Sequence, residues 1–158
     1  MNGGNMSGRN SDYSASRTKA NYKDVFYQGS ALVMIRLDDT FPFPDDLGEV
    51  SRSLEAYHLR EAFQFTLDYL EHANVIRRFK QEVRNGDSDV DLSRFDLMYS
   101  LCPNAYVELQ AKSQDLTLGT GNESIVINLK KALREKEVDV RRQVIRKLTE
   151  GIFKAVRS

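Results

Sequence analysis

The sequence predicts a mainly α-helical protein, a bundle of four or five helices with one or two short β-strands and a flexible N-terminal tail. Apolar residues recur every three or four positions over 47–84, 123–137 and 140–156, the period of amphipathic helices. One short apolar run, 30–37, has the length of a strand. A chain of 158 residues favours a single domain.

The tail is predicted from composition. Residues 1–20 are rich in glycine, serine and asparagine and hold almost no apolar side chains. Such a segment cannot bury enough surface to offset the entropy of ordering it. We therefore expect a flexible tail over 1–20 and a single helical domain over 21–158. An alternative is an arm that becomes ordered on a partner, with Tyr13 and Arg17 as its anchors.

The run SALVMIRL over 30–37 is predicted to form a strand, since Gly29 precedes it and Asp38 and Asp39 follow it. One strand must pair with another, in this chain or in a second one. The segment TFPFPDD then forces extended or turn geometry on Phe41 and Phe43, because each precedes a proline. We expect both phenylalanines to face the core; alternatively, they form a docking segment for a partner groove.

The stretch 47–84 is the strongest helical signal. Asp45 or Asp46 can cap its start, and the register of its apolar stripe shifts near 73–75, where we expect a break or kink. Gly86 is a suitable stop after the C-terminal end. The stripe predicts a buried face that includes Phe63, Leu67 and Leu70.

The remaining elements are predicted from the same signals. A short helix over 92–101 is expected to end at Pro103, and 103–118 fits either a short helix or a hairpin. Asn122 can cap the helix over 123–137, and Asp139 the helix over 140–156.

Composition limits the classes of function. The chain has 23 basic and 23 acidic residues, so its formal net charge of zero gives no global attraction to nucleic acid or membranes. One cysteine and two histidines make a His/Cys metal site implausible, and we expect no metal or cofactor. No apolar run approaches the length of a membrane span, and the first residues lack the apolar core of a signal peptide. We expect a cytoplasmic protein without a membrane partner.

Basic residues nevertheless gather locally. The segment 130–157 contains ten basic and four acidic residues. The apolar stripe of the last helix places the basic residues of that helix on its outer face. Such a face suits nucleic acid, because phosphate neutralisation releases counterions, or an acidic protein; it also suits a solvated helix. The candidate nucleic-acid or partner-binding residues are Arg142, Arg146, Lys147, Lys154 and Arg157, with a second cluster of Arg77, Arg78 and Lys80.

Arg52 and His58 are separated by five residues in the sequence RSLEAYH. This spacing resembles the arginine–histidine signature of the HEPN ribonuclease families. The resemblance implies a helical bundle that acts as a dimer and cleaves RNA without a metal at a composite site. The residue after the arginine, often asparagine in those families, is Ser53 here.

No other set of residues in the sequence suggests catalysis. The leading hypothesis is therefore a non-enzymatic small helical subunit or adaptor of a larger assembly, with a protein partner or self-assembly. The first alternative is a nucleic-acid-binding protein that uses the basic face, and the second is a HEPN-like ribonuclease.

Overall fold

The structure is a computed structural model that describes residues 3–55, 60–79, 98–113 and 122–157. These residues form six helices and a small antiparallel sheet, so the predicted mainly α fold with a few short strands is confirmed. The helices are α1 (Gly3–Thr40), α2 (Gly48–Glu55), α3 (Arg60–His72), α4 (Pro103–Gln110), α5 (Ile125–Leu133) and α6 (Val138–Arg157). The strands are β1 (Asp45–Asp46), β2 (Ile76–Arg78) and β3 (Met98–Leu101).

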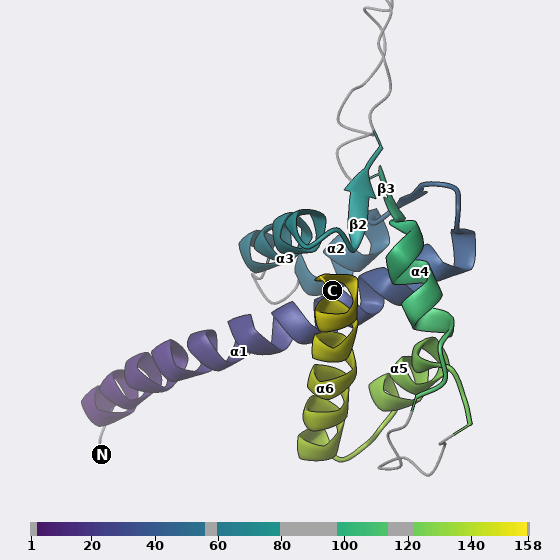
Figure 1. Cartoon of the computed structure of the whole chain (residues 1–158). Coiled ribbons are helices and arrows are strands. Elements are labelled where there is room, and N and C mark those ends of the chain that lie inside the picture. The colour runs from purple at the N-terminus through teal and green to yellow at the C-terminus, as the bar shows by residue number, and fades with distance from the viewer. Residues whose placement is uncertain (1–2, 56–59, 80–97, 114–121, 158) are drawn as a thin grey trace, which may run out of the picture.

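The C-terminal half of α1 is the centre of the fold (Figure 1), and helices α3, α5 and α6 and strand β3 all pack against it. The strand predicted over 30–37 is therefore wrong, since these residues lie inside α1. Ala31, Val33, Met34 and Leu37 are fully buried. A helix with neighbours on several sides is apolar around much of its circumference, and over eight residues that pattern resembles a buried strand.

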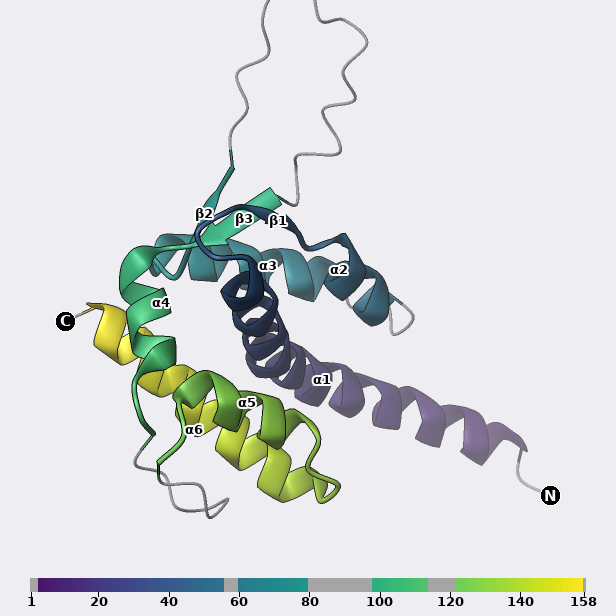
Figure 2. The same ribbon diagram turned by 90° about the vertical axis from the view of Figure 1, so that its right-hand side faces the viewer.

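The N-terminal half of α1 projects away from the other elements in both views (Figures 1 and 2). Its helical backbone reaches back to Gly3, through the segment predicted as a tail. The flexibility of 1–20 and the domain boundary at residue 21 remain predictions.

The described part of the stretch 47–84, which was predicted as one long helix, holds helices α2 and α3 and then strand β2. Just before α2, the Asp46 carboxylate accepts a hydrogen bond from the Gly48 N–H at 2.8 Å and so satisfies one of the N–H groups of the first turn that have no partner within the helix. Helix α3 buries Phe63, Leu67 and Leu70 as predicted.

The break expected at 73–75 is confirmed. Helix α3 ends at His72, and Asn74, two residues later, has a left-handed φ of 60°, a conformation common for asparagine just after a helix. The predicted continuation of the helix beyond this point is wrong for 76–78, which form β2.

The sheet has the order β1-β3-β2, and both pairings are antiparallel. Central strand β3 places Tyr99 opposite Asp45 on one side and opposite Arg78 on the other. The helix predicted over 92–101 is therefore wrong for 98–101, and the part before residue 98 lies outside the described residues. Tyr99 and Leu101 are fully buried, which fixes this strand against α1.

Pro103 begins α4 rather than ending a helix, because a first-turn proline loses no intrahelical hydrogen bond. The helical alternative for 103–118 is thus the correct one as far as Gln110, and a hairpin that starts at Tyr106 is wrong. Ser124, not Asn122, caps α5, since its hydroxyl accepts a hydrogen bond from the Ile127 N–H at 3.4 Å. The last helix, α6, matches its prediction within two residues at each end.

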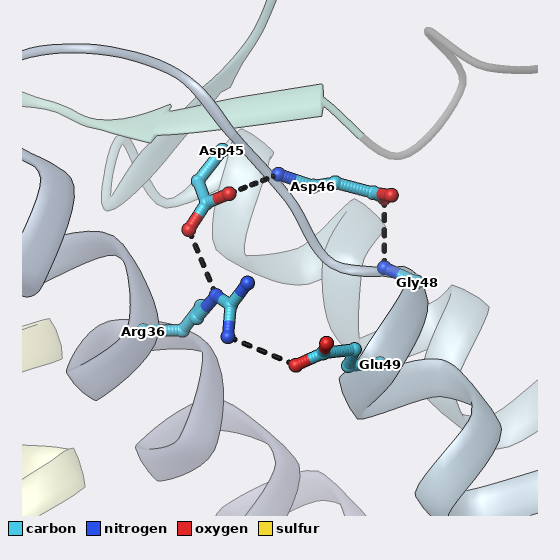
Figure 3. Close-up of polar contacts among 5 residues, drawn as sticks. All are labelled: Arg36, Asp45, Asp46, Gly48 and Glu49. Atoms are coloured by element: carbon cyan, nitrogen blue, oxygen red, sulfur yellow. Dashed lines mark hydrogen bonds and ion pairs between the residues drawn. The ribbon is translucent and has the colours of Figure 1, made fainter.

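A cluster of charged groups holds the loop after α1 (Figure 3). The Arg36 Nε donates to Asp45 at 2.8 Å, and a second guanidinium nitrogen donates to Glu49 at 3.0 Å. The hydrogen bond with Asp45 raises the pKa of Arg36. One arginine therefore ties both β1 and the first turn of α2 to α1.

Candidate functional site

A cavity of about 710 Å³ lies between α1 and α3. Its lining is mainly aromatic and aliphatic, with two carboxylates and one imidazole among the side chains. The lining residues are Tyr22, Phe26, Glu61, Ala62, Phe65, Thr66, Asp68, Tyr69 and His72. We call this feature the aromatic groove.

A packed aromatic cluster forms one wall of the aromatic groove. Phe26 of α1 meets Tyr69 of α3 edge to face, with ring centroids 5.0 Å apart. Phe153 of α6 lies 5.3 Å from Tyr69 and 5.9 Å from Phe26. Side chains from three helices, α1, α3 and α6, thus hold this wall in place.

Three aromatic side chains of the aromatic groove remain in contact with solvent. Phe65 is 74% exposed, Tyr22 47% and Tyr69 39%. Single exposed aromatics are ordinary on protein surfaces, but three around one cavity form a contiguous apolar site. These residues were not predicted from the sequence as a site. A signal did exist, because Phe65 and Tyr69 are four positions apart and mark a second apolar face on the helix whose first face carries Leu67.

Two polar side chains of the aromatic groove contact the backbone of their own helix. Buried Thr66 donates its hydroxyl hydrogen to the Ala62 carbonyl oxygen at 2.9 Å, within its own helix. The His72 Nδ1 lies 2.8 Å from the Asp68 backbone oxygen. Neither contact pairs a nucleophile with a base. Glu61 and Asp68 add negative charge two helical turns apart.

The five basic residues predicted on the last helix do lie on the exposed side of α6. Val144, Leu148 and Ile152 on the opposite side are buried, as the apolar stripe predicted. Whether this face binds nucleic acid or a partner stays a prediction.

Carboxylates already engage part of the basic face. The Arg142 guanidinium lies 2.7 Å from Asp24 of α1, and Arg146 lies 3.2 Å from Glu150. The Tyr27 hydroxyl donates to the same Glu150 oxygen at 2.6 Å, and this bond, together with Arg146, lowers the pKa of Glu150. These contacts join α6 to α1 and offset some of the positive charge.

The second basic cluster lies on a strand rather than a helix. Arg77 and Arg78 are exposed on edge strand β2. Arg78 donates to the Tyr99 hydroxyl at 3.1 Å, and Arg77 donates to Ser100 at 3.2 Å. Lys80 lies outside the described residues. The two basic groups are therefore carried by different elements, β2 and α6.

Phe41 and Phe43 lie in different environments. Phe41 stacks on Tyr106 of α4, with ring centroids 4.0 Å apart and planes within 8°, and packs against the core. Phe43 is 72% exposed, so the expectation that it faces the core is wrong. Its alternative role as a docking residue stays a prediction.

Of the two residues that carry the HEPN resemblance, Arg52 is exposed on α2, whereas His58 lies outside the described residues. The composite ribonuclease site therefore stays a prediction.

Within the described ranges, no cluster of three or more histidine, cysteine or carboxylate side chains is arranged to bind a metal. None of the helices, searched over the same ranges, combines the length and apolar character that crossing a membrane requires. No protein-family model, curated protein or solved structure matches the chain.

Proposed function

We propose that this chain is a non-enzymatic subunit or adaptor that binds another protein through the aromatic groove. The observation that carries the proposal is the convergence of Phe65, Tyr22 and Tyr69, all partly exposed, on one cavity of about 710 Å³. Aromatic side chains in well-formed pockets dominate the energetics of protein interfaces.

The exposed area of Phe65 is large enough to contribute several kcal/mol to binding when a partner covers it. Phe65 is 74% exposed, and an aromatic side chain buries roughly 150–250 Å² when fully covered. Covering the rest of Phe65 would remove on the order of 150 Å² from water, worth roughly 4 kcal/mol before the costs of association. The packed rings of Phe26, Tyr69 and Phe153 reduce those costs, since the wall is already ordered.

The experiment compares two aromatic truncations. Phe65 and Phe43 have nearly equal exposure, 74% and 72%, but only Phe65 lines the aromatic groove. Full-length tagged protein is purified from its native host as the parent, as Phe65→Ala and as Phe43→Ala, and stoichiometric proteins that co-elute are identified. Both variants are expected to unfold at the parent's temperature, because neither side chain is in the core.

The proposal expects a stoichiometric protein partner with the parent and Phe43→Ala, and its loss with Phe65→Ala. Loss with Phe43→Ala alone assigns docking to the proline-flanked loop instead. A partner retained by both variants shows that the aromatic groove is not the interface. Nuclease-sensitive nucleic acid that co-elutes without protein favours the basic face of α6.

A further inference from the structure

We infer that the occupant of the aromatic groove is an amphipathic α-helix of about three turns that carries lysine or arginine beside its apolar face. The inference rests on the proposed function and specifies the partner of the same site. It follows from the walls of the groove, from its length and from its charge.

The walls favour a helix over an extended peptide. Both long walls are helices, α1 and α3, whose internal backbone groups are hydrogen-bonded within each helix. An extended segment would therefore bury backbone N–H and C=O groups against side chains without partners for them. A helix satisfies its own backbone and presents only side chains. It would pack beside α1 and α3 as a third helix.

The length of the groove sets the length of the occupant. The α3 residues that line it begin at Glu61 and end at His72. At 1.5 Å per residue this stretch is about 17 Å long, roughly three helical turns. Apolar side chains of the occupant at positions i, i+3 or i+4, and i+7 would then meet Phe65, Tyr69 and Tyr22.

The negative charge of the groove favours basic residues beside the apolar face of the bound helix. Glu61 and Asp68 are seven residues apart on α3, so they lie two turns apart along the same side of the opening. In the described part of the chain, neither carboxylate has a basic group within 4.0 Å. Basic residues two turns apart on an incoming helix match both, whereas acidic residues there would be repelled.

The test uses three synthetic helical peptides of about 15 residues, long enough to form the required turns. The first has a leucine face flanked by lysines, the second has the same face flanked by glutamates, and the third is a scramble of the first that breaks the face. Each carries a fluorophore, and anisotropy measures its affinity for the full-length protein at low and high salt.

The lysine-flanked peptide should bind roughly tenfold tighter than the glutamate-flanked one, the size expected when two surface contacts change from repulsive to attractive. High salt should reduce this preference. Combining Glu61→Lys with Asp68→Lys should reverse it, and Phe65→Ala should weaken both peptides. Combining Glu137→Lys with Asp139→Lys, at two exposed acids away from the groove, is the matched control and should leave the preference unchanged.

Equal affinity for the two flanked peptides, with dependence on Phe65, overturns the basic occupant but leaves the proposed function standing. Equal binding of the scramble overturns the amphipathic helix. If no peptide binds although a native partner is captured through Phe65, the occupant is not a helix. The remaining alternative is that a second copy of this chain occupies the aromatic groove. Sedimentation velocity without peptide tests it: a dimer in the parent that becomes a monomer in Phe65→Ala would overturn the inference.

Discussion

Replacing Gly29 by alanine tests the central helix on which the whole fold depends. Gly29 stands directly before the run that resembles a strand, where a turn would be expected, yet it lies in the middle of α1. If the helix is continuous there, Gly29→Ala should stabilise the protein. If Gly29 forms a turn, the same change should leave the stability unaltered or lower it.

The size of the gain can be worked out from two contributions. An alanine in a helix interior is favoured over glycine by about 0.8–1 kcal/mol. A Cβ at this position would lie 3.6 Å and 3.8 Å from two ring carbons of Phe63 and 3.8 Å from the Thr66 methyl, all ordinary contacts. Three such contacts add about 0.3–0.6 kcal/mol of dispersion. The expected gain is therefore about 1–1.5 kcal/mol, or roughly 2–6 °C in melting temperature.

Gly151→Ala is the matched control, because nothing lies within 4 Å of a Cβ there and Gly151 is exposed in the middle of α6. It should give the helix-propensity gain alone, about 0.8–1 kcal/mol. Urea unfolding followed by circular dichroism measures both variants, since the chain has no tryptophan. Destabilisation by Gly29→Ala, together with stabilisation by Gly151→Ala, would refute a continuous α1 and the close packing of Phe63 on it.

The burial of Leu67 and Asp38, the cap of α5 and the spacing of Arg52 and His58 can each be tested by one substitution. Leu67→Ala should lower the free energy of unfolding by about 2–5 kcal/mol because the side chain is fully buried, whereas Phe65→Ala should change it by less than about 1 kcal/mol; equal losses would contradict the exposure of Phe65. Ser124→Ala removes the cap of α5 and should cost about 0.5–1 kcal/mol by urea unfolding, and no loss would mean that the long 3.4 Å bond contributes nothing. Burial raises the pKa of Asp38, so the folded state binds the proton more readily than the unfolded chain. The unfolding free energy of the parent relative to Asp38→Asn should therefore improve as the pH falls from 7 to 4, and a decline over that range would contradict the raised pKa. A mixed RNA substrate should remain intact with the parent, as with Arg52→Ala, on denaturing gels; cleavage that disappears in Arg52→Ala would support the HEPN resemblance instead.

The two C-terminal helices could be predicted from sequence because each buries one face. In α6 the buried residues Val144, Leu148 and Ile152 repeat every four positions, and the exposed bases lie between them. Such a pattern has a single interpretation, because a helix at the edge of a fold is apolar on one side only.

The central helix and the strands could not be predicted in this way. Residues 30–37 of α1 have neighbours on several sides, so their apolar side chains show no clear helical period. Strands β2 and β3 are three and four residues long, too short for an alternating pattern to stand out from a helical one. The pairing of β2 with β3 joins residues more than 20 positions apart, which local patterns do not record.

The aromatic groove could not be predicted from the sequence for a different reason. The i, i+4 pair of Phe65 and Tyr69 is visible in the sequence, but a pair of aromatics on a helix is usually covered by the core. Only the position of α1 beside α3 shows that Tyr22 joins them and that all three remain partly exposed. A groove between two helices exists only once the helices have packed, and the residue patterns within each helix do not show which helices become neighbours.

Electrostatics also favours the aromatic groove over the basic face of α6 as the first surface to test. A phosphate or an acidic partner that approached Arg142 and Arg146 would compete with Asp24 and Glu150, which already lie 2.7 Å and 3.2 Å from them. Each exposed pair is worth only about 0–1 kcal/mol, but an incoming anion must replace it before it gains anything. A basic helix that enters the groove displaces no such ion pair from Glu61 or Asp68 among the described residues. Its charge contacts would therefore add to the burial of Phe65 without breaking an existing ion pair of either carboxylate.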